Sequence, residues 1–120
     1  MELIESIVKR AQADPQRIIL PEGTEERTLK AADIILEQKI AEIVLLGNKQ
    51  EIEKISADLG LKNIDKAQII DPQDNPNHQK YVDLLFKLRQ RKGMTEEQAY
   101  EQAKDPLYLA CLMIKSGDAD

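Results

Sequence analysis

Apolar residues in the first part of the chain form two patterns, short continuous runs and stripes with helical spacing. The runs at 18–20, 42–47 and 67–71 are rich in aliphatic and β-branched residues, which is typical of buried strands. The segments 2–12, 24–40 and 48–60 repeat apolar residues every three or four positions, which predicts helices with one buried face. Strands that alternate with helices of this length predict a parallel sheet with right-handed crossovers.

Polar residues at the helix starts predict where each helix begins. Thr24 is expected to cap the second helix, with Glu25 and Glu26 in the first turn, where the helix dipole favours negative charge. Asn48 is expected to cap the third helix, with Glu51 three residues later in a box-like arrangement.

Helices are predicted to dominate after a polar, proline-containing loop at residues 71–78. The first covers residues 78–92 and ends at Gly93. Thr95 and Gln98 form a capping-box pattern, and Asp105 before Pro106 predicts the start of the last helix. That helix is apolar over eight consecutive residues, 107–114, so it is expected to be buried on most sides.

The predicted fold class is therefore α/β, a three-layer α/β/α arrangement with a parallel sheet. Three strands and their helices offer little protein to cover the apolar last helix. Parallel sheets also need cover on both faces and usually contain more strands. The chain is expected to be an incomplete domain or to need a partner. A compact three-layer domain with a frayed tail is the alternative.

Composition narrows the function classes. The 120 residues favour one domain, and the net charge of −5 argues against a nucleic-acid binder, whose surface would be basic. No apolar stretch reaches about 18 residues and the N-terminus has no secretory pattern, so no membrane association is expected. The only cysteine, Cys111, lies in an apolar run and is expected to be buried and inert. A reducing, cytoplasmic location follows.

Five stretches in order resemble the N-terminal part of the phosphate acetyltransferase (phosphotransacetylase) family: "ILPEGTEERTLKAADIIL", "EIVLLGN", "IIDP", "LRQRKGMTEEQA" and "DPLYLACLMIKSGDAD". The resemblance implies a two-domain enzyme with an isocitrate dehydrogenase-like fold. Residues 1–120 would be the N-terminal part of the phosphate acetyl/butyryl transferase domain, with the second domain absent. Such enzymes transfer an acetyl group between acetyl phosphate and coenzyme A. They are usually dimers, with the active site between the domains.

The resemblance assigns one binding residue and no catalytic residue. The family's base is an aspartate, assisted by a serine and an arginine late in the chain, and no position here matches that motif. Arg89 matches an arginine associated with coenzyme A, and its planar guanidinium suits the 3′-phosphate. Coenzyme A is thus expected as a substrate, with no tightly bound cofactor and no metal. The alternative is that cations at a helix end, Arg89 among them, complement the helix dipole.

Two further candidate sites, a cleft rim and a metal site, do not depend on the resemblance. Glu22 and Arg27 follow a strand at its carboxyl end, where ligands bind in open parallel sheets, so they could form a cleft rim. A plain strand-to-helix turn with a mutual Glu–Arg pair is the favoured alternative. Asp71, Asp74 and His78 could hold a metal, but a lone histidine among loop acids more often caps or is solvated.

Three functions remain open on the sequence. The first is the N-terminal fragment of a phosphate acetyltransferase, inactive alone. The second is a relative in that family, such as a phosphate butyryltransferase or the family domain fused to some malic enzymes. The third is a non-catalytic α/β interaction module.

Overall fold

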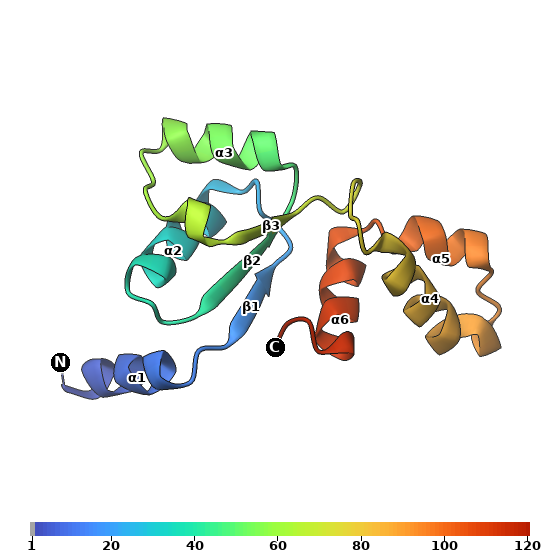
Figure 1. The fold of residues 1–120 in the computed structure, drawn as a ribbon, viewed down its shortest axis with the longest axis horizontal. Coiled ribbons are helices and arrows are strands. Elements are labelled where there is room, and N and C mark those ends of the chain that lie inside the picture. Colours follow the sequence, from blue (N-terminus) through green and yellow to red (C-terminus); the bar gives the residue numbers. More distant parts are fainter. Residues whose placement is uncertain (1) are drawn as a thin grey trace.

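A computed structural model of the chain describes residues 2–120 and contains a three-stranded parallel sheet with helices packed on it (Figure 1). The strands are β1 (Arg17–Leu20), β2 (Glu42–Leu46) and β3 (Gln68–Ile70), in the order β1-β2-β3. The predicted parallel pairing is confirmed, with Arg17 opposite Glu42 and Leu46 opposite Ile70.

The helices follow the predicted segments closely. They are α1 (Glu2–Ala13), α2 (Glu26–Glu37), α3 (Lys49–Asp58), α4 (His78–Arg89), α5 (Glu96–Gln102) and α6 (Pro106–Ser116). Two 3₁₀ turns, η1 (Ile64–Lys66) and η2 (Gln90–Lys92), complete the described elements. The helix predicted over 78–92 ends at Arg89 and tightens into η2 before Gly93, whose φ is 89°.

Three predicted caps are present and one is wrong. Asn48 caps α3, Thr95 and Gln98 form the capping box of α5, and Asp105 caps α6. Thr24 does not cap α2. Its methyl group instead lies beside Gly47, and the Glu25 carboxylate accepts the hydrogen bond from the Thr28 amide at 3.0 Å.

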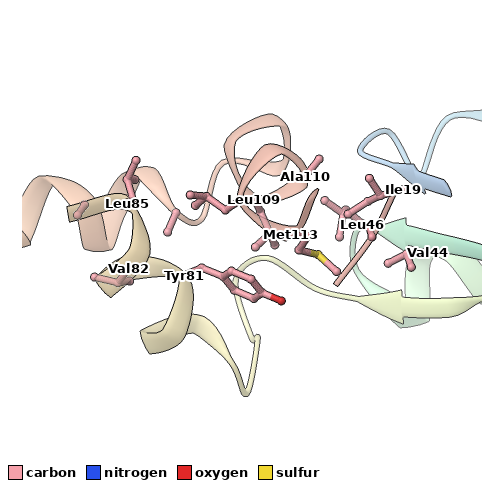
Figure 2. Close-up of a cluster of buried hydrophobic side chains, with 13 residues drawn as sticks. Ile19, Val44, Leu46, Tyr81, Val82, Leu85, Leu109, Ala110 and Met113 are labelled. Atoms are coloured by element: carbon pink, nitrogen blue, oxygen red, sulfur yellow. The ribbon is translucent and has the colours of Figure 1, made fainter. Parts of the chain in front are cut away.

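The two faces of the sheet pack against different helices, because neighbouring residues of a strand point to opposite sides. Ile43 and Leu45 face α2 and α3, in the cluster Leu29, Ala32, Leu36, Ile43, Leu45, Ile52 and Ile64. Val44 and Leu46 face the other way, toward the cluster that includes Leu109 and Met113 of α6 (Figure 2). The predicted three-layer arrangement is confirmed.

The molecule is extended and leaves apolar helix faces uncovered. Its radius of gyration is 16.2 Å, against about 13.6 Å for a compact domain of this length. Its accessible surface is 8119 Å², against roughly 6,600 Å² for a folded monomer of this size. α1 buries no residue, and Leu107 and Ile114 of α6 are 63% and 47% exposed. These values fit an incomplete domain and contradict the compact alternative.

Among residues 2–120, no helix combines the length and the apolar character that crossing a lipid bilayer requires.

A polar cluster fixes the end of α6 against α4. The Asp118 carboxylate accepts hydrogen bonds from Lys80 Nζ at 2.6 Å, from the Tyr81 hydroxyl at 2.6 Å and from Ser116 Oγ at 2.9 Å. The bond from Lys80, followed by that from Tyr81, lowers the pKa of Asp118 to about 2. Burial, with the Asp118 carboxylate as the next cause, raises the pKa of Tyr81 above its ordinary value.

The turn after β1 depends on a glycine. The Gly23 amide donates to the Leu46 carbonyl at 3.0 Å, which joins the turn to the end of β2. A Cβ atom at this position would lie 2.5 Å from the same carbonyl oxygen. The glycine in the Pro21–Gly23 stretch is therefore explained by this close backbone approach.

We predict that Gly23→Ala destabilises the chain by about 2–3 kcal/mol, because the new methyl group meets a backbone oxygen that has little room to move. Urea unfolding followed by circular dichroism measures the change. Glu22→Ala, at the exposed neighbouring position, is the control and should shift stability by less than about 0.5 kcal/mol. Equal effects of the two substitutions would contradict the close-approach explanation.

Asp118→Asn should cost about 1 kcal/mol at pH 7, a modest value because 34% of the carboxylate side chain is exposed to solvent. A depressed folded pKa adds stability above the unfolded value, near 3.8, and that stability disappears as the pH falls toward 2. Unfolding of both proteins at several pH values tests this. A difference that stays constant from pH 7 to pH 2 would rule out the charged carboxylate as its source.

Candidate functional site

A groove between α4 and α6 combines apolar walls with basic side chains. It has a volume of about 490 Å³. Leu85 and Leu88 of α4 form one wall, and the α6 wall consists of Leu107, Tyr108, Cys111 and Leu112. Arg89 and Lys115 also line it, so both carry positive charge into an otherwise apolar depression.

Arg89 is the last residue of α4 and its side chain is exposed. Lys87, Arg91 and Lys92 are exposed beside it along α4 and η2. Within residues 2–120, none of these four side chains forms an ion pair or a side-chain hydrogen bond with the protein. Their charges complement the carboxyl end of α4, and they are also available to an external anion.

Glu22 follows the carboxyl end of β1, and Arg27 lies in the first turn of α2. Figure 1 shows α2 well separated from α4. Glu22 and Arg27 are both exposed, and no ion pair joins them in the part of the chain that the structure describes, so the expected mutual pair is absent. The turn is held instead by backbone contacts, with Gly23 bonded to β2 and the Glu25 amide bonded to the Glu22 carbonyl at 3.1 Å. Arg89 at the end of α4 and the turn after β1 therefore do not form one site.

Asp71 in the loop before α4 and His78 at the start of α4 both make contacts within the protein. Asp71 accepts from the Gln73 amide at 2.9 Å, and His78 packs edge-on against Tyr100 with ring centroids 4.5 Å apart. Asp74 is exposed in the same loop. Among residues 2–120 no three His, Cys, Asp or Glu side chains converge as a metal site.

The prediction that Cys111 is buried is wrong, because it is exposed in the groove. α6 buries Leu109 and Met113 against the sheet and α4. Leu107, Cys111 and Ile114, spaced four and three residues apart, lie on the opposite face of the helix and remain open. A helix that is apolar all round gives no periodic signal to indicate which face is covered.

Comparison with known proteins identifies the family. Residues 2–120 match the family described as phosphate acetyl/butaryl transferase. The chain belongs to this family. It is 47% identical over 120 residues to the phosphate acetyltransferase of Thermoanaerobacterium thermosaccharolyticum. The matched region covers 100% of this chain and 36% of that protein. The phosphate acetyltransferase of Escherichia coli K12 is 41% identical over 114 residues, which cover 95% of this chain and 16% of the relative.

Solved structures agree with the family assignment. A phosphotransacetylase from Streptococcus pyogenes superimposes with a TM-score of 0.90 at 25% identity, covering 99% of this chain and 36% of that one. The EutD phosphotransacetylase from Staphylococcus aureus gives a TM-score of 0.88 with the same coverage. The chain therefore spans about a third of the length of these proteins, and less of the longest relatives, and it corresponds to their N-terminal part.

We predict that Cys111 reacts with a thiol reagent such as Ellman's reagent while the chain is folded, because its side chain is open to solvent. The chain has a single cysteine, so absorbance reports this site alone. A Cys111→Ala, Leu109→Cys variant is the matched control, since residue 109 is fully buried and its thiol should react only on unfolding. Protection of Cys111 in a monomer would contradict the open groove.

Proposed function

We propose that this chain is the N-terminal part of an enzyme that interconverts acetyl phosphate plus coenzyme A with acetyl-coenzyme A plus phosphate. The observation that carries the proposal is the match along the whole chain to proteins named phosphate acetyltransferase. Coenzyme A is a substrate in this proposal, and no tightly bound cofactor takes part. The remaining two thirds of the enzyme would supply the second domain.

The chemistry explains why the segment should be inactive alone. A base must remove the thiol proton, since a free thiol has a pKa of about 8.5, and donors must stabilise the oxyanion. A base works best with a pKa near the operating pH. Asp118, with a pKa of about 2 and three hydrogen-bond donors on its carboxylate, is too weak a base for this task. Asp118 is therefore not proposed as the base, and the catalytic groups are proposed to lie outside residues 1–120.

Arg89 is proposed to bind a phosphate of coenzyme A. Its guanidinium can donate two parallel charged hydrogen bonds to phosphate oxygens, and no protein carboxylate among residues 2–120 competes for it. Lys87, Arg91 and Lys92 raise the positive potential around it. The apolar groove beside Arg89 offers cover for the uncharged part of a ligand.

Two broader properties belong to the same proposal. The enzyme is expected to be cytoplasmic and to act as a homodimer. The uncovered apolar faces of α1 and α6 support association with further protein, in the same chain or in another copy. Glu22 and Arg27 are still proposed to form a cleft rim. The proposal is supported by their position after β1 and by the fact that neither forms an ion pair within residues 2–120.

Butyryl transfer is the second candidate, because the family description covers both acetyl and butyryl transferases. The segment should show no activity alone, and its fusion to the remaining two thirds of the T. thermosaccharolyticum relative should restore it. Comparing acetyl-coenzyme A with butyryl-coenzyme A in that fusion distinguishes the two enzymes. A fusion that folds but transfers neither group would support the non-catalytic interaction module.

Arg89→Ala in the fused enzyme should raise the KM for coenzyme A about tenfold or more, since a charged hydrogen bond contributes about 1.5–3 kcal/mol. The KM for acetyl phosphate should change little. Arg91→Ala is the matched control, because it removes an equal charge from the same exposed cluster. Equal changes in both KM values, or an equal effect of the two variants, would remove Arg89 from this role.

A further inference from the structure

A second cavity, here called the α3 cavity, lies between α3 and the edge strand β3. It has a volume of about 400 Å³, which is within the range of small-molecule sites. Lys49, Glu53 and Ser56 form its α3 wall, because their spacing of four and three residues places them on one face of the helix. The segment 61–69, which contains η1 and part of β3, forms the opposite wall. Figure 1 shows α3 well away from α4 and α6.

The floor of the α3 cavity is aliphatic. Ile64 is buried in the cluster that covers this face of the sheet, and Leu61 and Ile69 pack against that cluster while they stay partly exposed. Ala57 and Ala67 also line the cavity with small side chains. An aliphatic group that enters the cavity therefore leaves water for an apolar surface, which is favourable.

Ser56 brings an unpartnered hydroxyl to the wall of the cavity. The residue is 6% exposed, and within residues 2–120 its Oγ atom has no hydrogen-bond partner. A buried polar group without a partner destabilises the fold. A serine hydroxyl both donates and accepts, and rotation about χ1 alone turns it toward a neighbouring space. A polar ligand atom in the cavity would supply the missing hydrogen bond.

The rim of the cavity carries both signs of charge. Lys49 and Lys62 supply ammonium groups, and Glu53 and Asp65 supply carboxylates. All four side chains are exposed, and within residues 2–120 none of them forms an ion pair or a side-chain hydrogen bond. Charges of both signs around one depression complement a ligand that itself carries both, rather than a simple anion or cation.

We propose that the α3 cavity binds an aliphatic α-amino acid such as leucine in its zwitterionic form. The ligand carboxylate faces the rim lysines and accepts from the Ser56 hydroxyl. The ligand ammonium group faces the carboxylates of Glu53 and Asp65, and the aliphatic side chain lies on the floor. The site is on the face of the sheet opposite the groove between α4 and α6, and it does not depend on the proposed activity.

Titration of the chain with L-leucine, followed by two-dimensional amide NMR, tests the site. The amide signals of Ser56, Ala57 and Ile69 should shift and saturate. Those of Leu109 and Met113, which pack on the other face of the sheet, should stay unchanged. Shifts that do not saturate, or that spread equally over both faces, overturn the proposal.

Three analogues separate the parts of the ligand. Glycine lacks the aliphatic side chain, isocaproate lacks the ammonium group, and isopentylamine lacks the carboxylate. Each should bind about fivefold more weakly than leucine or worse, because each loses one of the three complementary contacts. Binding of isocaproate or isopentylamine as tight as that of leucine overturns the zwitterion, and equally tight binding of glycine overturns the role of the floor.

The Ser56→Ala variant gives a result that a purely structural serine would not. Removing an unpartnered buried hydroxyl should leave the free chain at least as stable in urea, whereas leucine binding should weaken about fivefold because a hydrogen bond is lost. A variant that binds leucine as tightly as the original chain overturns the proposed hydrogen bond.

Lys49→Gln should weaken leucine binding about threefold, because it removes a rim cation. Lys54→Gln is the matched control, since Lys54 is exposed on the same helix and does not line the cavity. Equal effects of the two substitutions would mean that net charge, and not the rim, governs binding, and this overturns the proposal.

Discussion

A parallel sheet has to be covered on both faces, and this requirement determines the path of the whole chain. α2 and α3 cover one face because they connect neighbouring strands. The other face has no such connection, so the chain must leave β3, form α4 and α5 to one side, and return with α6 against Val44 and Leu46. This return brings the residues after α6 to the edge of β1, where Arg17 meets them.

Local chemistry explains why so much of this architecture could be predicted from the sequence. Alternating strand and helix patterns predicted the parallel sheet, and short-range caps at Asn48, Thr95 and Asp105 depend only on residues within a turn. Thr24 does not cap α2, since the Glu25 side chain takes that role, and the methyl group of Thr24 lies beside Gly47 in a different connection. The exposure of Cys111 could not be predicted, because it depends on which face of α6 meets the sheet.

The sequence predicts the fold more completely than it predicts the candidate site. Family resemblance indicates Arg89, and its basic neighbours are visible in the sequence. The groove beside it exists only because α4 and α6 pack together. That no carboxylate among residues 2–120 pairs with Arg89 and its basic neighbours is a property of the tertiary structure. No local sequence pattern predicts the hydrogen bond from the Tyr81 hydroxyl to the Asp118 carboxylate, because the two residues are 37 positions apart.

α1 differs from the other helices because it contributes no residue to either hydrophobic cluster. It has twelve residues and buries none of them, and a hydrogen bond from Gln12 to the Gln38 carbonyl connects it to α2. Isolated helices of this length are marginal in water. In the separate segment, α1 should therefore open often, so a protease would cleave this arm first and leave a shortened protein whose sheet and both hydrophobic clusters remain intact.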